Sequence, residues 1–191
     1  MTGGKQEDNM SILNTILAEI ASVLGHVEEN SIEKFTDYLL AGKRIFVTGE
    51  GRSGFMGKSF AMRLMHLGAQ VFVVGETITP AMGGGDILVA VSGSGATASV
   101  LNAAKKATSL GCAVLAVTTN AEAELARAST YFMVIPAATK QRNSGEAETV
   151  QPLGSLFDQS LHIVLDAICL RYAKLQHLSN QIAFQKHSNL E

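Results

Sequence analysis

The sequence is poor in the features that mark several large classes of protein. Its 191 residues include two cysteines, three prolines and no tryptophan, and charged residues make up 17% of the chain. It has no run of about 20 apolar residues, the length that a helix needs to cross a bilayer. Two cysteines without C-x-x-C spacing exclude a disulfide framework and a zinc finger, so we expect Cys112 and Cys169 to be buried thiols.

The chain also lacks a surplus of positive charge. Fifteen Lys and Arg residues stand against seventeen Asp and Glu residues, which gives a formal charge of −2. Proteins that bind nucleic acid neutralise phosphates with a basic excess, so we expect no nucleic-acid partner. The polar beginning of the chain leads into a helical pattern rather than into the apolar core of a signal peptide. These features predict a cytoplasmic protein with no membrane partner.

Apolar material, in contrast, is plentiful. Hydrophobic residues make up 47% of the sequence, enough for the core of one ordinary domain of this length. We expect a single domain over 1–191, because no repeat or linker divides the chain. Within it, 1–9 is expected to be flexible, 10–42 to form N-terminal helices, and 43–191 to form an α/β core with a C-terminal helix.

Short apolar runs rich in β-branched residues predict the strands of this core. They lie at 44–48, 71–74, 87–91, 113–118 and 131–135. Helical stretches are predicted at 54–67, 97–109, 121–128 and 154–175. Strands that are apolar on both sides are typical of a parallel sheet covered on both faces. The alternation predicts an α/β fold, a three-layer αβα sandwich whose five-stranded parallel sheet has the order 2-1-3-4-5.

One connection in this pattern is unusual. The segment 75–86 is too rich in Gly and Pro for a long regular helix. We expect it to form a loop over the carboxyl end of the sheet, where folds of this class bind ligands.

The first of two glycine-rich segments follows the strand at 44–48. Residues 49–54 match G-x-G-x-x-G, and Glu76 stands 22 residues after Gly54, as in a dinucleotide-binding fold. A P-loop is excluded, because Arg52 stands where its first glycine belongs. A guanidinium here can bind a sugar hydroxyl, a phosphate or developing enolate charge. We therefore expect Gly51, Arg52 and Ser53 to bind substrate.

The second glycine-rich segment, Ser92-Gly93-Ser94-Gly95-Ala96-Thr97, follows the strand at 87–91 and opens a helix. Backbone amides at a helix N-terminus suit a phosphate, and the glycines let the backbone approach it closely. Serine and threonine hydroxyls add further donors. We expect five residues to bind the phosphate: Ser92, Gly93, Ser94, Gly95 and Thr97. The alternative is a helix cap with a serine-rich turn.

These segments resemble the sugar isomerase (SIS) domain, whose signature S-x-S-G-x-T is matched at 92–97. The likeness is closer to the 6-phospho-3-hexuloisomerases. It rests on G-x-G-R-S-G at 49–54, K-S-F-A-M-R-L-M-H-L-G at 58–68, V-G-E-x-x-T-P at 74–80, Q-P-L-G-S-L-F at 151–157 and H-x-N-L-E at 187–191. The resemblance implies interconversion of 3-hexulose 6-phosphate and fructose 6-phosphate without a metal or organic cofactor. It also implies a homotetramer with active sites at subunit interfaces.

The resemblance also suggests the catalytic groups. Asp158 stands where the family usually has the glutamate that transfers the proton. Its side chain is shorter than that of glutamate, so the carboxylate reaches less far by roughly one C–C bond. Otherwise, Asp158 is an N-terminal helix carboxylate favoured by the dipole. His187 and Glu76 are the other candidate bases, and His187 is expected to reach a neighbouring subunit. Three alternatives remain open: a phosphosugar-sensing module without catalysis, an isomerase that acts on a different sugar phosphate, and a dinucleotide-dependent enzyme.

Overall fold

The computed structural model describes residues 11–143 and 146–190, so the segment 1–9 lies outside the described residues. The strands are β1 (Ile45–Gly49), β2 (Val71–Val73), β3 (Ile87–Val91), β4 (Ala113–Thr118) and β5 (Tyr131–Val134). The helices are α1 (Ile12–Leu24), α2 (Glu29–Ala41), α3 (Gly51–His66), α4 (Ala98–Ser109), α5 (Glu124–Arg127), α6 (Ser155–Leu175) and α7 (Asn180–Phe184). Each predicted strand is present, within one residue of its predicted ends.

The strands form a five-stranded sheet in the order β2-β1-β3-β4-β5, and every pair is parallel. The predicted fold class and strand order are thereby confirmed. β3 lies in the middle, and all five of its residues are buried. Because the strands are parallel, the segments that follow β1, β3 and β5 all emerge at the carboxyl edge of the sheet.

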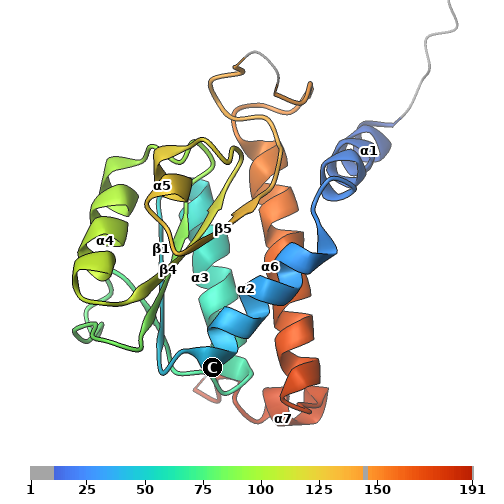
Figure 1. Cartoon of the computed structure of the whole chain (residues 1–191). Helices are drawn as coiled ribbons and strands as arrows, with labels where there is room; N and C mark the ends of the chain where they lie inside the picture. Colours follow the sequence, from blue (N-terminus) through green and yellow to red (C-terminus); the bar gives the residue numbers. More distant parts are fainter. Residues whose placement is uncertain (1–10, 144–145, 191) are drawn as a thin grey trace, which may run out of the picture.

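Alternate residues of the strands point to opposite faces, and both faces are covered (Figure 1). On one face Val47, Val89 and Leu115 pack against buried residues of α2, α3 and α6. On the other face Phe46, Leu88 and Val114 pack against α4 and α5. Burial on both faces explains why the strands appear in the sequence as continuous apolar runs rather than as alternating ones.

The helix after β1 begins three residues earlier than the sequence predicts. Gly51, at φ +57°, turns the chain, and the residues from Gly51 onward belong to α3. A Cβ at Gly54 would lie 2.6 Å from the carbonyl oxygen of Gly49, so the glycine lets α3 pack closely on β1. The glycines of 49–54 thus serve close packing as well as a turn. The predicted helix 121–128 is shorter, and α7 was not predicted.

The expectation for 75–86 is wrong. This segment leaves β2 at the carboxyl edge but must enter β3 at the opposite edge, so it crosses a face of the sheet instead of lying over its carboxyl end. Met82 packs against the cluster that contains Phe46, with Phe72 beside it. The segment therefore occupies the place on the α4 side that a crossover helix would take.

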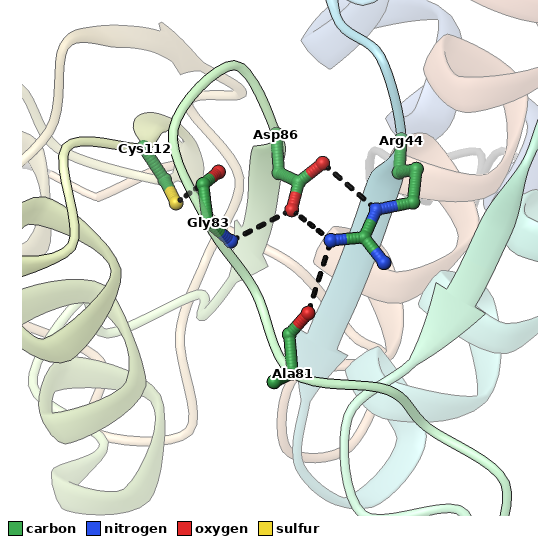
Figure 2. Close-up of polar contacts among 5 residues, drawn as sticks. All are labelled: Arg44, Ala81, Gly83, Asp86 and Cys112. Atoms are coloured by element: carbon green, nitrogen blue, oxygen red, sulfur yellow. Dashed lines mark hydrogen bonds and ion pairs between the residues drawn. The ribbon is translucent and has the colours of Figure 1, made fainter.

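A polar cluster fixes the far end of this crossing segment (Figure 2). The guanidinium of Arg44 donates to both carboxylate oxygens of Asp86, at 2.9 and 2.6 Å, and to the carbonyl of Ala81 at 3.0 Å. The amide of Gly83 donates to Asp86 at 2.8 Å, and the Cys112 thiol donates to the carbonyl of Gly83. The Arg44 guanidinium holds the pKa of Asp86 below its usual range. The cluster lies at the edge of the sheet where β1, β3 and β4 begin.

Both cysteines are buried and free, as the sequence predicts. Burial raises the pKa of the Cys112 thiol and raises that of Cys169 to about 12, so neither is a reactive thiolate at neutral pH. Among the described residues, no helix combines the length and the apolar character that crossing a membrane requires.

Candidate active site

A pocket of about 350 Å³ opens at the carboxyl edge of the sheet. Four segments form it: the turn from β1 into α3, the turn from β3 into α4, the chain after β5, and the beginning of α6. Its lining includes Arg52, Ser53, Ser92, Gly93, Ser94, Thr97, Thr139, Lys140, Gln141, Leu153, Gly154 and Asp158. The structure therefore brings together the two glycine-rich segments and the carboxylate that were predicted separately.

The turn from β3 into α4 is braced from within. The Ser92 hydroxyl accepts a hydrogen bond from the amide of Gly95 at 3.1 Å and lies 2.8 Å from the hydroxyl of Thr97. The amide of Leu125 donates to the carbonyl of Gly95 at 3.0 Å. Gly95 is buried at φ +60° and shapes the turn without lining the pocket. Ser92 and Gly95 thus hold the turn in shape.

Other parts of this turn are open to a ligand. Within the described residues, the amides of Ser94 and Thr97 have no protein acceptor. The first turn of α4 adds the positive end of the helix dipole, as at other phosphate-binding helix N-termini. Ser94 is exposed, and its hydroxyl accepts, from the part of the chain that the structure describes, only a long contact of 3.3 Å from the amide of Ala96. The turn offers main-chain and hydroxyl donors to an anion.

Asp158 lies in the first turn of α6, and its side chain is only 7% exposed. The Ser53 hydroxyl donates to one carboxylate oxygen at 2.7 Å, and Nε of Arg52 lies 3.2 Å from the other. Burial raises the pKa of Asp158, and the hydrogen bond from Ser53 and the charge of Arg52 only partly oppose this effect. A carboxyl whose pKa is raised accepts a proton more readily near neutral pH, as a general base must.

Arg52 connects the two helices that meet at the pocket. Besides its ion pair with Asp158, its guanidinium donates to the Ser155 hydroxyl of α6 at 3.2 Å. The side chain remains 61% exposed, so it also faces the pocket opening. Glu50, just before Arg52, accepts a hydrogen bond from Ser99 of α4 at 2.8 Å, which joins the two phosphate-type turns. The predicted pair Arg52 and Ser53 thus contacts the predicted carboxylate.

Besides Gly95, two further predicted site residues, Glu76 and His187, do not line this pocket. Glu76 forms an exposed ion pair with Lys58 of α3, with 2.8 Å between Nζ and Oε1. The His187 ring stacks on that of His66, at 5.2 Å between ring centroids. His66 ends α3 and stands 14 residues after Arg52, so the ring on which His187 stacks lies about 21 Å along the helix from Arg52. Within one chain, only Asp158 of the three candidate bases faces the pocket.

Sequence reasoning missed the wall of the pocket formed by the chain after β5. Thr139, Lys140 and Gln141 line the pocket, although Lys140 begins a polar stretch that resembles an ordinary surface loop. Thr139 is held by Glu146, which accepts from its amide at 2.6 Å and from its hydroxyl at 2.7 Å. The available signal was topological, because a segment that follows a parallel strand begins at the ligand-binding edge of the sheet.

Comparison with known proteins agrees with this geometry. Residues 38–163 match the family model described as the SIS domain. The chain is 38% identical over 176 residues to a 3-hexulose-6-phosphate isomerase of Bacillus subtilis, which covers 92% of this chain and 95% of the relative. It is 35% identical to a protein of the same name from Mycobacterium gastri, covering 97% and 92% of the two chains.

A solved structure gives the same result in three dimensions. A Methanococcus jannaschii protein, whose crystal structure infers a molecular function of 3-hexulose-6-phosphate isomerase, superposes with a TM-score of 0.82 at 30% identity. The match covers 94% of this chain and 98% of the other. The family model spans the sheet, both turns and the first part of α6, and the relatives match along almost their whole length. This chain belongs to the SIS domain family.

Proposed function

We propose that this protein is a phosphosugar isomerase that interconverts 3-hexulose 6-phosphate and fructose 6-phosphate. One observation carries the proposal: a buried carboxylate, paired with Arg52, shares a pocket with an anion-binding turn at a helix N-terminus. The relatives named above support the choice of sugar phosphate. A pocket of about 350 Å³ suits a compact ligand of this size.

The turn Ser92–Thr97 binds the phosphoryl group in this proposal. Amides of Ser94 and Thr97 and the exposed Ser94 hydroxyl donate to its oxygens, and Lys140, which also lines the pocket, supplies a positive charge. Fixing the phosphate at one end of the sugar restricts where the reacting carbons can lie, which lowers the entropic part of the barrier. The carbon chain then extends toward Asp158.

Asp158 moves the proton. Starting from the 3-ketose, its carboxylate removes the hydrogen from C2, and the C2–H electron pair forms the C2=C3 bond of an enediolate. The carboxyl group returns the proton to C3, and the transfer of a proton from the C2 oxygen to the C3 oxygen completes the 2-ketose. The Arg52 guanidinium stabilises the negative charge that develops on oxygen. The raised pKa of Asp158 suits both halves of this exchange.

The dinucleotide alternative is less consistent with the site. Such an enzyme needs an acidic residue after the second strand to bind ribose hydroxyls. Glu76, the residue at that position, is paired with Lys58 and does not line the pocket. The pocket also lies near the lower end of the size range for small-molecule sites.

Nuclear magnetic resonance of fructose 6-phosphate in deuterated water tests the proposal. With substrate carrying ¹³C at C2, we expect the ketose signal to convert partly into that of a C2 alcohol, and deuterium to enter at C3. Exchange at C1 instead would indicate an aldose–ketose isomerase acting on another sugar phosphate. Binding of fructose 6-phosphate with neither conversion nor exchange would indicate a sensing module, and the isomerase proposal would be wrong.

The proposal includes a homotetramer with sites at subunit interfaces, in which His187 serves the site of a neighbouring subunit. Large apolar side chains of α1 support an interface, since Ile12, Leu13 and Leu17 are 80%, 71% and 62% exposed. Leu170 on α6 is exposed as well. Patches of this kind on a folded surface mark places where protein surfaces associate.

A complementation experiment tests the shared site. We expect Asp158→Ala and His187→Ala each to lose most isomerase activity, and co-expressed subunits of the two variants to regain part of it. Recovery follows because some hybrid sites combine an intact Asp158 from one subunit with an intact His187 from another. Absence of recovery in isolated hybrid oligomers would show that His187 serves its own chain or no site.

A further inference from the structure

The pocket has one wall without regular secondary structure. Between the end of β5 at Val134 and the beginning of α6 at Ser155, the described chain contains neither helix nor strand. Five residues of this segment line the pocket: Thr139, Lys140, Gln141, Leu153 and Gly154. Arg142 and Leu153 both lie at φ +53°, a conformation that costs energy in residues other than glycine. Contacts from elsewhere must therefore hold this wall in place.

Glu19 provides such contacts from α1. Its carboxylate accepts three hydrogen bonds from consecutive residues of the wall segment: the Thr149 hydroxyl at 2.6 Å, the Val150 amide at 2.9 Å and the Gln151 side chain at 2.9 Å. Burial raises its pKa, but these hydrogen bonds and the charge of Arg142 outweigh that effect, so the net pKa lies below the usual value. Glu19 is thus an ionised acceptor that binds residues 130 and more positions later in the chain.

The contacts continue from Glu19 to the pocket lining. Gln151 is buried, and its carbonyl accepts a hydrogen bond from the Arg142 guanidinium. The same guanidinium donates to the carbonyl of Thr139 at 3.1 Å. Arg142 therefore joins the two ends of the wall, and Glu19 joins one of these ends to α1. Leu153 and Gly154 follow Gln151 closely in the chain. They line the pocket and lead into α6, the helix that carries Asp158.

We infer that Glu19 is a positioning residue for the active site. It holds 149–151 in the place that keeps the two ends of the wall around the bound sugar phosphate. The inference rests on the proposed function for the identity of the substrate. A carboxylate that only attached α1 to the rest of the domain could bind any neighbouring element. Glu19 instead binds 149–151, the residues directly before the pocket-lining Leu153 and Gly154. Glu19 contacts neither the phosphate turn nor Asp158, so its effect is on binding rather than on proton transfer.

The test compares Glu19→Ala with Glu33→Ala. Glu33 is a matched control, because it also joins an N-terminal helix to a distant element, pairing with Arg171 of α6 at 3.3 Å, and it does not line the pocket. We expect Glu19→Ala to raise both KM and the Kd of fructose 6-phosphate about tenfold, since the binding-competent wall is populated less, with kcat changed less than about twofold. We expect Glu33→Ala to leave both constants unchanged.

Hydrogen exchange followed by mass spectrometry gives a readout that is independent of substrate. In the Glu19→Ala variant, amides of 139–143, 149–151 and 153–154 should exchange at least about tenfold faster than in the parent, while those of 92–97 remain as protected. Thr149→Val, which leaves α1 intact, should move KM in the same direction by less. Equal KM values for the two Glu→Ala variants, or unchanged exchange in the wall, would overturn the inference. If the parent does not isomerise fructose 6-phosphate, the proposed function fails, while the exchange result still decides whether Glu19 orders the wall.

Discussion

Replacement of Asp158 by asparagine is expected to lower kcat for the hexulose phosphate by a factor of about 10³, with KM changed less than about threefold. The amide has nearly the same shape as the carboxyl group but cannot accept the proton. Its oxygen can face Arg52, and its NH₂ group can donate to the Ser53 hydroxyl, which is able to accept as well as donate. The contacts around residue 158 are therefore retained while the base is lost.

Stability provides the first control for this variant. Because the pKa of Asp158 is raised on folding, the native state binds the proton more tightly than the unfolded chain does. The buried charge therefore lowers the free energy of unfolding as pH rises from the pKa of Asp158 in the unfolded chain, about 3.9, through its higher pKa in the folded protein. Asp158→Asn removes this charge, so we expect its Tm at neutral pH to equal or exceed that of the parent. A loss of activity without a loss of stability assigns the effect to chemistry.

A second control keeps the carboxylate and changes its reach. Asp158→Glu restores the residue that the 6-phospho-3-hexuloisomerases usually carry, and we expect it to retain measurable turnover. In the parent, kcat/KM should fall as pH drops through the raised pKa of Asp158, since only the ionised form is a base. If Asp158→Asn keeps more than about a tenth of the parental kcat, Asp158 is not the base, and Glu76 and His187 remain the candidates.

The sequence predicts those parts of the fold that are determined locally. Runs such as 87–91 and 113–118 are continuous and β-branched because both faces of the sheet are covered, and nothing distant is needed to recognise them. The path of 75–86 is different. It follows from the parallel pairing of β2, β1 and β3, which puts the start of β3 at the amino edge of the sheet, and the pairing of Arg44 with Asp86, 42 residues apart, holds the end of the segment there. Composition alone shows that the segment is not a helix, but not which way it runs.

The same distinction applies to the candidate site. Ser94, Arg52 and Asp158 belong to short motifs whose chemistry can be read from neighbouring residues. Lys140 and Glu19 belong to no motif. Topology indicates that the chain after β5, which carries Lys140, begins at the ligand-binding edge, but the contact of Glu19 with this chain becomes evident only in the folded structure. His187 belongs to a motif, yet it lies at the far end of α3 from the pocket of its own chain. Its predicted role thus depends on a neighbouring subunit.

The second large effect is expected from Gly95→Ala. A Cβ at this position would lie 2.4 Å from the Cβ of Ala123 and 2.9 Å from the hydroxyl of Thr118, and φ is +60°. The turn must then move away from the start of α5, carrying Ser94 and Thr97 out of place. We expect KM and the Kd of fructose 6-phosphate to rise about 100-fold. Strain and overpacking together should lower stability by about 3 kcal/mol, a fall in Tm of roughly 6 to 12 °C.

Two companion variants separate the clash from the strain of a positive φ. Gly111→Ala adds a Cβ at φ +73° with no atom within 4 Å, outside the pocket lining, so it should lower stability modestly and leave binding unchanged. Ala123→Gly, combined with Gly95→Ala, removes the nearer of the two clashing atoms and should recover part of the lost affinity. Recovery would show that the displacement of the turn, rather than the added methyl group itself, weakens binding.

Ser94→Ala tests the same turn without disturbing its shape. It removes one exposed hydroxyl and only the 3.3 Å contact to Ala96, so Tm should change little. Loss of one donor to a charged phosphate should raise KM about tenfold and alter kcat less. Binding of fructose 6-phosphate, measured by calorimetry, should therefore weaken in the order Ser94→Ala, then Gly95→Ala. The proposed anion site consists of main-chain amides, and only this backbone path directs them into the pocket. If Gly95→Ala binds fructose 6-phosphate with the affinity of the parent, the phosphate does not bind at this turn, even if the variant is less stable.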